Sequence, residues 1–298
     1  MAFEVVMDRF YRILIAPFTF INNYFKSFIF LFIVILAWYF LHTPKEDYEE
    51  PNLARIELTG PIVSSDEMYK KVKKILSQKS IKGVLLIINS PGGLVAPSIE
   101  ISDLIKELNE QIPVVAYVSG LMASGSYYGG MHANTIVANR GSMIGSIGVI
   151  FSSVNIEELM QKIGIKNQII TAGEYKQIGT PLRQWKDNEK KFLENLIKDQ
   201  YDMFVNDVAA ARHLDVKKYK DFAEGKVFIA EKALKLGLID AIGNLDSSKQ
   251  KLFQLTGVKD PIWYVPYTPS VLEEFINKLS TNISSQILNA LTGLTARI

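Results

Sequence analysis

The amino-acid sequence predicts an α/β domain preceded by one membrane-spanning helix. From residue 53 onward, short apolar and β-branched runs alternate with longer amphipathic segments, which is the pattern of strands connected by helices. Ahead of this alternation, residues 28–41 form an uninterrupted apolar and aromatic run, FIFLFIVILAWYFL. The chain has 298 residues, which is enough for one large domain or two smaller ones.

The apolar run predicts an uncleaved signal anchor over residues 27–42. Together with the apolar residues before it and a snorkelling Lys26, it approaches the roughly 20 residues that span a bilayer. A cleavable signal peptide would need small residues before its cut site, but this run ends in FLHTP. The other alternative, a buried core helix, would not be apolar on every face at the extreme N-terminus. Basic residues precede the run and acidic ones follow it, so the positive-inside rule places residues 1–26 in the cytoplasm and the domain outside it.

The rest of the chain divides into three predicted parts. Residues 43–52, with two prolines and several charges, form a linker, and residues 53–268 form the α/β domain. Residues 269–298 have apolar side chains at near-helical spacing. We expect this amphipathic segment to pack against the domain or another subunit, because its polar face lacks the basic residues that favour a membrane surface. The predicted strands are residues 53–58, 84–88, 114–118, 135–138, 147–151 and 168–171, and the predicted helices are residues 66–78, 97–109, 156–163, 187–213, 230–236 and 247–256.

Composition excludes several classes of function. The formal net charge is +2 and no basic cluster suited to nucleic acid is present, so we expect no nucleic-acid partner. The chain has no cysteine, which excludes disulfides, thiolate catalysis and cysteine-based metal sites. We expect neither a metal nor a cofactor.

Ser124 is the first candidate site residue. It lies in the run GLMASGSYYGG, directly after the predicted strand 114–118 and at the start of a segment that can be helical. A helix N-terminus there would favour developing negative charge at the hydroxyl. The run is not the G-x-S-x-G elbow, because Met122 and Ser126 occupy its glycine positions. Most serines in such turns are caps or packing residues, so this motif alone does not predict catalysis.

A second loop, NSPGG at residues 89–93, follows the neighbouring predicted strand. Both loops therefore lie at carboxyl ends of strands, where α/β folds place their sites. The N–H groups of Gly92 and Gly93 could form one half of an oxyanion hole, and that of Gly125 the other half. Each such donor lowers an acyl-transfer barrier by about 3 to 4 kcal/mol. The alternative is a tight turn that opens a helix.

A serine nucleophile needs a base, and none of the three histidines is a convincing one. His42 lies at the membrane edge, His132 would be about 12 Å from Ser124 along a continuous helix, and His213 lies among charged residues. A lysine can be the base if burial lowers its pKa. Lys176 lies in TAGEYKQIGTPLR, among small and apolar residues, and is the lysine whose surroundings differ from the charged helices that carry most of the others.

Four ordered segments make the chain resemble the short, single-domain signal peptide peptidases of peptidase family S49, which also includes the SohB-like proteases. The resemblance covers roughly residues 51–260, and the predicted anchor is also typical of the family. The segments are NSPGG at 89–93, ASGSYY at 123–128, GSIGVI at 145–150 and GEYKQIGTPLR at 173–183.

The resemblance implies a Ser/Lys dyad. Ser124 would be the nucleophile, Lys176 the general base and Ser146 a hydrogen-bond partner of the lysine amine. Gly93 and Gly125, with Gly92 beside them, would supply the oxyanion donors. Ser126 departs from the family, in which this position is often glycine.

The resemblance also implies the fold, the assembly and the substrates. The fold would be the ClpP/crotonase type, a spiral of ββα units. Family members form ring- or dome-shaped homo-oligomers whose sites are shared between subunits, and Ser124 and Lys176 could come from the same chain or from two. The substrates would be apolar remnant signal peptides. The chain would be a single-pass protein of the bacterial cytoplasmic membrane, with its catalytic domain outside the cytoplasm.

Three alternatives remain at this point. The chain could be a SohB-like or other anchored protease with different substrates, or a catalytically inactive membrane scaffold of crotonase fold. An acyl-CoA enzyme of that fold is the third, but acyl-CoA is cytoplasmic and the predicted domain is not.

Overall fold

The computed structural model describes residues 24–38 and 49–266, and the chain divides into two compact units, Met1–Glu49 and Glu50–Ile298. In the first unit, residues 24–38 form a helix whose side chains are exposed. Within the described ranges, no helix combines the length and the hydropathy that crossing a bilayer requires. The predicted anchor is helical as far as residue 38. Residues 39–42, most of the predicted linker and the segment 269–298 lie outside the described residues.

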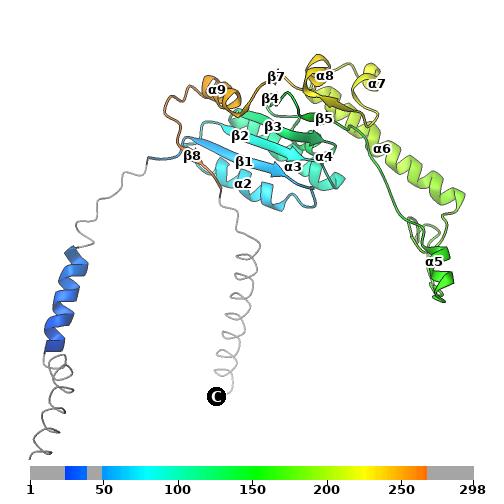
Figure 1. The fold of residues 1–298 in the computed structure, drawn as a ribbon, viewed down its shortest axis with the longest axis horizontal. Coiled ribbons are helices and arrows are strands. Elements are labelled where there is room, and N and C mark those ends of the chain that lie inside the picture. Colours follow the sequence, from blue (N-terminus) through cyan, green and yellow to red (C-terminus); the bar gives the residue numbers. More distant parts are fainter. Residues whose placement is uncertain (1–23, 39–48, 267–298) are drawn as a thin grey trace, which may run out of the picture. The chain divides into compact units, whose positions relative to one another are not determined.

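The described part of the second unit is built around an eight-stranded sheet (Figure 1), which confirms the predicted α/β class. The strand order is β6-β5-β3-β2-β1-β8, and β4 pairs with both β3 and β7. All pairs are parallel except β5 with β6. The strands are β1 (Leu53–Thr59), β2 (Val84–Ser90), β3 (Val114–Ala123), β4 (Thr135–Ala138), β5 (Met143–Gly145), β6 (Val227–Ile229), β7 (Ala241–Ile242) and β8 (Trp263–Tyr264).

Helices connect the parallel strands and cover both faces of the sheet. In this unit the α-helices are α2 (Asp66–Leu76), α3 (Val95–Gln111), α4 (Gly125–Gly130), α5 (Glu157–Lys162), α6 (Asp187–Ala211), α7 (Tyr219–Phe222), α8 (Ala230–Lys235) and α9 (Leu245–Thr256), with a short 3-10 helix at Val216–Lys218.

Strand β2 shows how the core is organised. Leu86 and Ile88 belong to the larger core cluster, with side chains of α2, α3 and α4, whereas Leu85 and Ile87 pack on the other face with Leu252 of α9. Successive side chains of a strand point to opposite faces. A strand covered on both faces therefore needs a continuous apolar run, which is why residues 84–88 have no polar member.

Strand β3 positions the site because it changes partner along its length. Its first half, Val115 to Val118, pairs with β4, and its last residues, Leu121 to Ala123, pair with β5. The other edge of β3 pairs with β2 throughout, with one irregularity between Ile88 and Ser90. The segment after β3 is thus held between the ends of β2 and β5.

Two predicted strands are wrong. Residues 147–151 and 168–171 are not strands, and the described strand nearest to the first is β5, Met143–Gly145. Both segments are rich in β-branched residues, but β-propensity stabilises a strand only where a neighbour and a buried face are available. Residues 168–171 are exposed throughout.

The segment between the site and α6 forms an arm, which we define as residues 150–186. It contains α5 and Lys176, and none of its residues is fully buried. In Figure 1 the arm lies at the far end of α6, away from the sheet.

We expect Leu86→Ala to lower the free energy of unfolding by about 2 to 5 kcal/mol, because the side chain is fully buried and leaves a cavity. Leu255→Ala is the matched control. Leu255 is 40% exposed, so its truncation is expected to cost well under about 1 kcal/mol. Urea denaturation followed by circular dichroism measures both, and equal losses would contradict the assignment of β2 to the core.

Candidate functional site

Ser124 lies at the junction of β3 and α4 with a backbone conformation that is rare for a residue with a side chain. Its φ is 53° and its ψ is −125°. Its N–H donates to the carbonyl of Gly145 at 2.8 Å, and its own carbonyl accepts from Tyr128 N at 3.0 Å. A non-glycine residue in such a region costs about 1 to 3 kcal/mol, and such residues cluster at functional sites. The hydroxyl-bearing residue is half-buried rather than exposed on an open turn.

Ser126 is the residue that closes this turn. Its side chain is fully buried. The hydroxyl accepts from Ala123 N at 2.8 Å and lies within hydrogen-bond distance of two carbonyl acceptors, Ser90 O at 2.7 Å and Ala123 O at 2.9 Å. It therefore ties the end of β3 to the end of β2 and is directed away from the position of Ser124. The Ser126 hydroxyl is therefore occupied by contacts within the fold.

The glycines of the two loops lie against one another. Gly92 has a φ of 89°, and a Cβ there would lie 2.4 Å from Gly125 N. A Cβ on Gly125 would lie 2.2 Å from the Ser98 hydroxyl oxygen and 3.1 Å from Gly93 N. No side chain fits at either position, because backbone atoms and the buried Ser98 occupy the space. The two loops that the sequence singled out separately therefore meet beside Ser124.

A cavity of about 600 Å³ opens at this point. Ser146 lies on its wall with a φ of 50°, and its N–H donates to Lys226 O at 2.7 Å. Glu224, the acidic residue of the wall, accepts a hydrogen bond from the Tyr201 hydroxyl at 2.9 Å. No lysine or histidine is among the described lining residues, which are Pro91, Gly93, Val95, Ser98, Ser124, Gly125, Tyr128, Ser146, Gly148, Val149, Ile150, Gln200, Tyr201, Met203, Phe204, Glu224 and Gly225.

Lys176 lies elsewhere in the same chain. The residues beside it contact the N-terminal part of α6, where the ring of Tyr175 stacks on that of Phe192 at 5.0 Å. The cavity is lined by residues further along this helix, beginning with Gln200. Phe192 and Gln200 are separated by about 12 Å along the helix axis, at about 1.5 Å per residue. A single chain therefore brings Ser124, Ser146 and the glycines together, but not Lys176.

Two of the histidines line a different cavity. His132 and His213 lie on the wall of a cavity of about 470 Å³, beside Arg212 and Asp240. Burial is the main cause that lowers the pKa of His132, and Lys106 lowers it further, whereas nearby carboxylates oppose this shift. Neither histidine lines the cavity of Ser124. His42 lies outside the described residues.

The sequence did not reveal the contribution of α6 to the site. The Tyr128 hydroxyl donates to the Asp207 carboxylate, and the rings of Tyr128 and Phe204 lie 4.7 Å apart. Burial and the bond to Asp207 raise the pKa of Tyr128. Burial and the bond to Glu224 raise the pKa of Tyr201 to about 12. Both phenols stay protonated at neutral pH. The only sequence feature that pointed to this helix was the spacing of its apolar residues. That spacing predicts a buried face but not the element on which the face packs.

Among the residues that the structure describes, no group of three histidine, aspartate or glutamate side chains is placed to hold a metal ion. The polar groups of the residues that line the Ser124 cavity include hydroxyl groups, backbone N–H donors and the Glu224 carboxylate.

A model of peptidase family S49 matches residues 106–259. The chain belongs to peptidase family S49. A model of the Clp protease family also matches residues 52–137. These two matches confirm the predicted family and, with the sheet described above, the relation to Clp proteases. The protein is a peptidase of this family.

Several relatives support this assignment. The chain is 41% identical over 210 residues to a Synechocystis sp. protein named "Putative protease slr0021", covering 70% of this chain and 76% of the relative. It is 34% identical over 187 residues to the chloroplastic serine protease SPPA of Arabidopsis thaliana, covering 62% of this chain and 28% of that protein. The present chain thus spans most of the length of the Synechocystis protein and less than a third of the length of the Arabidopsis protein.

Solved structures show the same fold at low sequence identity. One is a mutant of the membrane-bound stomatin-specific protease 1510-N. It superposes on this chain with a TM-score of 0.50 and 16% sequence identity, and the match covers 74% of this chain and 100% of that one. A second mutant of that protease, in complex with a substrate peptide, has a TM-score of 0.50 and 17% identity, and covers 78% of this chain and 100% of that one.

We expect Ser124→Gly to raise the free energy of unfolding by about 1 kcal/mol, because glycine adopts the conformation of residue 124 without strain. Ser124→Ala is the matched control, since it removes the same hydroxyl but keeps the Cβ and hence the strain. Chemical denaturation of the parent and both variants gives the comparison. A Ser124→Gly variant that is less stable than Ser124→Ala would show that the backbone at residue 124 is unstrained, because only the greater unfolded-state entropy of glycine would then separate the two variants.

Proposed function

We propose that this S49 peptidase is a membrane-anchored serine endopeptidase with a Ser/Lys dyad that is completed between subunits. Ser124 of one subunit is the nucleophile, and Lys176 of a neighbouring subunit is the general base. The substrates are apolar remnant signal peptides left after their release from preproteins. Residues 27–42 are the anchor, and the catalytic domain, residues 53–268, lies on the extracytoplasmic side of the bacterial cytoplasmic membrane.

One observation supports this assembly above all others. The cavity of Ser124 has a strained nucleophile position and close glycine N–H groups, but no lysine or histidine among its described lining residues. A serine hydroxyl is a weak nucleophile without an adjacent base. Lys176, the predicted base, is exposed on the arm of the same chain. A neighbouring subunit that inserts its arm at the cavity would supply Lys176 as the base that the cavity of each single chain lacks.

The proposed reaction balances with these groups. The neutral amine of Lys176 accepts the proton of Ser124 as its Oγ attacks the scissile carbonyl carbon. The N–H groups of Gly93 and Gly125 hydrogen-bond the resulting oxyanion. The lysine ammonium then donates its proton to the leaving amine, and the C–N bond breaks. Water, deprotonated by the same lysine, hydrolyses the acyl-serine and restores both groups. Ser146, on the cavity wall, would form a hydrogen bond with the side-chain amine of Lys176 from the neighbouring subunit.

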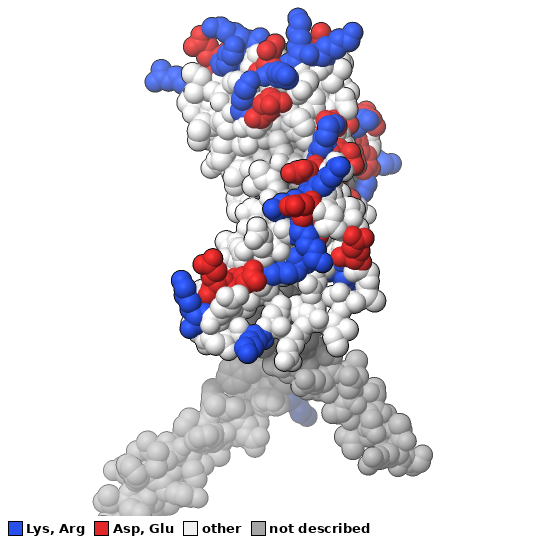
Figure 2. Space-filling model, turned by 90° about the vertical axis from the view of Figure 1, so that its right-hand side faces the viewer, with Lys and Arg blue, Asp and Glu red and all other residues white. Residues whose placement is uncertain are grey.

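The surface of the arm supports an interface between subunits. Its apolar side chains include Ile150, Val154 and Ile170, which are 89%, 70% and 102% exposed. Exposed apolar side chains of this kind favour an interaction with another protein surface. On the side seen in Figure 2, lysines and arginines alternate with acidic residues, and uncharged surface lies between them. We propose a ring- or dome-shaped homo-oligomer.

The proposed substrates are supported by the cavity and by the N-terminal sequence. Valine, isoleucine, methionine and phenylalanine side chains line much of the cavity wall, which suits apolar peptide side chains. An anchor at residues 27–42 would hold the domain beside the membrane, where apolar leader fragments gather. A peptide and a lipid bilayer are thus the proposed partners, together with further copies of the chain.

We expect Ser124→Ala and Lys176→Ala subunits to restore activity when they are mixed, although each alone is inactive. Random assembly places an intact serine beside an intact neighbouring lysine in about a quarter of the sites. Co-expression with two affinity tags, followed by cleavage of a signal-peptide fragment, measures this recovery. Absence of recovery in mixed particles would show that the dyad is not formed between subunits. Absence of cleavage by the assembled parent would favour the inactive scaffold.

We expect the cleavage rate of the assembled parent to rise with pH, because the lysine must lose its proton before it can accept one from Ser124. The rate is measured with the same fragment from neutral to alkaline pH. A rate that is independent of pH over this range would point to a base other than lysine.

A further inference from the structure

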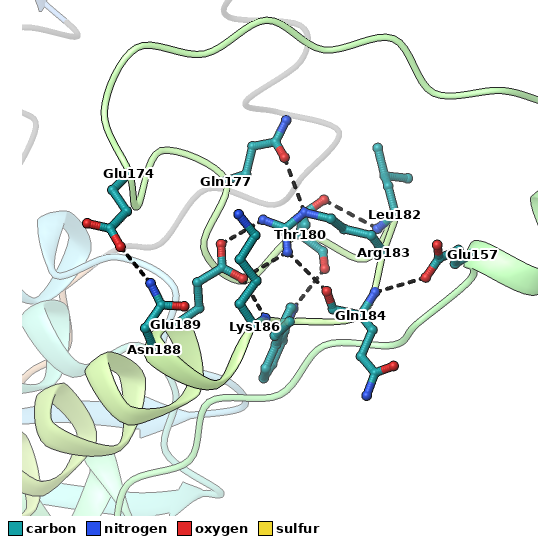
Figure 3. A network of polar contacts seen from close by, with 11 residues as sticks. Glu157, Glu174, Gln177, Thr180, Leu182, Arg183, Gln184, Lys186, Asn188 and Glu189 are labelled. Atoms are coloured by element: carbon teal, nitrogen blue, oxygen red, sulfur yellow. Dashed lines mark hydrogen bonds and ion pairs between the residues drawn. The ribbon is translucent and has the colours of Figure 1, made fainter.

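The base of the arm contains a buried ion pair, shown in Figure 3. The carboxylate of Glu189, in the first turn of α6, is 1% exposed. Both of its oxygens accept from Arg183, at 2.8 and 2.6 Å, and Lys186 N donates to it at 2.8 Å. These donors lower the pKa of Glu189 to about 2. Both the Glu189 carboxylate and the Arg183 guanidinium are therefore charged at neutral pH.

Arg183 also reaches the turn that carries Lys176. Its Nε donates to the Gln177 side-chain oxygen at 3.3 Å, and its Nη1 donates to Gln184 O at 3.0 Å. A planar guanidinium can hold the carboxylate with two nitrogens and still offer its remaining donors elsewhere, which a lysine cannot. Arg183 is thus a junction between the Lys176 turn and the first turn of α6.

The residues before Lys176 are attached to the same helix. The Glu174 carboxylate accepts from the Asn188 side chain at 2.7 Å, and Tyr175 stacks on Phe192. With the bond from Arg183 to Gln177, the residues on both sides of Lys176 are held by α6 or by the segment leading into it. The backbone position of Lys176 is therefore defined, although none of the residues of the arm is fully buried.

The side chain of Lys176 differs from those of Glu174, Tyr175 and Gln177, which each contact another side chain. It is exposed, and within the described part of the chain its ammonium makes no hydrogen bond or ion pair. Its ammonium is therefore available to a partner outside its own subunit.

We propose that Arg183 and Glu189 are positioning residues, a clamp that presents Lys176 to the Ser124 cavity of the neighbouring subunit. This inference rests on the proposed function. The clamp touches neither the substrate nor Ser124, and it acts only through the place at which it holds the lysine.

The first test uses the assembled full-length protein. Arg183→Lys and Glu189→Gln are each expected to lower kcat about 10- to 100-fold, because a displacement of about 1 Å at the reacting groups costs on the order of 100-fold. KM and the particle size are expected to stay unchanged, since neither residue lines the cavity. Wild-type kcat in both variants would overturn the clamp.

The second test uses mixed particles and separates positioning from a general loss of stability. Arg183→Lys is introduced either into the Ser124→Ala subunit, which supplies the lysine, or into the Lys176→Ala subunit, which supplies the serine. We expect activity to be lost when the substitution is in the lysine-supplying subunit and retained when it is in the other. Equal loss from both sides, or loss from neither, would overturn the proposal.

Arg212→Lys is the matched control. Arg212 follows the other end of α6, its side chain is 9% exposed, and it pairs with Asp240 at 2.7 Å. We expect Arg212→Lys to change the activity of the mixed particles by the same factor whether it is in the lysine-supplying or the serine-supplying subunit. If unsubstituted Ser124→Ala and Lys176→Ala subunits do not complement each other, the dyad between subunits is wrong, and the kcat of the Arg183 and Glu189 variants alone then decides whether the clamp exists.

Discussion

The hydrogen bonds of the buried Ser126 hydroxyl are the constraint on which the site depends. This one side chain connects the end of β3 to the end of β2, while Ser124 N bonds to β5 on the other side. The residue between these attachments has little freedom, so it adopts a conformation that a serine would otherwise avoid. The same attachment brings the NSPGG loop against Gly125 with no space for side chains. The strain at Ser124 is therefore maintained by the sheet around it.

The nucleophile and the proposed base are built on different kinds of structure. Ser124 stands on a parallel sheet that is buried on both faces, whereas Lys176 stands on an arm that contributes nothing to the core. The cavity of a single chain is formed without a lysine or histidine among its described lining residues. Under the proposed mechanism, proteolysis would then be confined to assembled particles, and the exposed apolar arms would make assembly favourable. Helix α6 links the two parts, because its first turn holds the arm and its later turns line the cavity.

The electrostatics of the arm are consistent with this division. A buried carboxylate without partners would raise its pKa and lose its charge, but Glu189 is paired twice by Arg183 and once by a backbone N–H. Lys176, like Lys162 and Lys166 of the arm, is exposed, and its ammonium makes no ion pair within the described residues. Under the proposed mechanism, Lys176 acts as a base at the place where it meets Ser124 of a neighbouring subunit.

The amino-acid sequence by itself determined the α/β class, most of the longer helices and strands and the two loops around Ser124, because these depend on local periodicity and turn chemistry. The ends of neighbouring parallel strands must lie at the same edge of the sheet, so the meeting of NSPGG with the Ser124 turn was also predictable. Local pattern failed at residues 147–151 and 168–171, where β-branched residues lack a strand to pair with. It also could not identify the hydrogen bonds of Ser126, the cavity wall on α6 or the pairing of Arg183 with Glu189. These depend on contacts between segments, and only the tertiary structure decided that Ser124 and Lys176 of one chain lie apart.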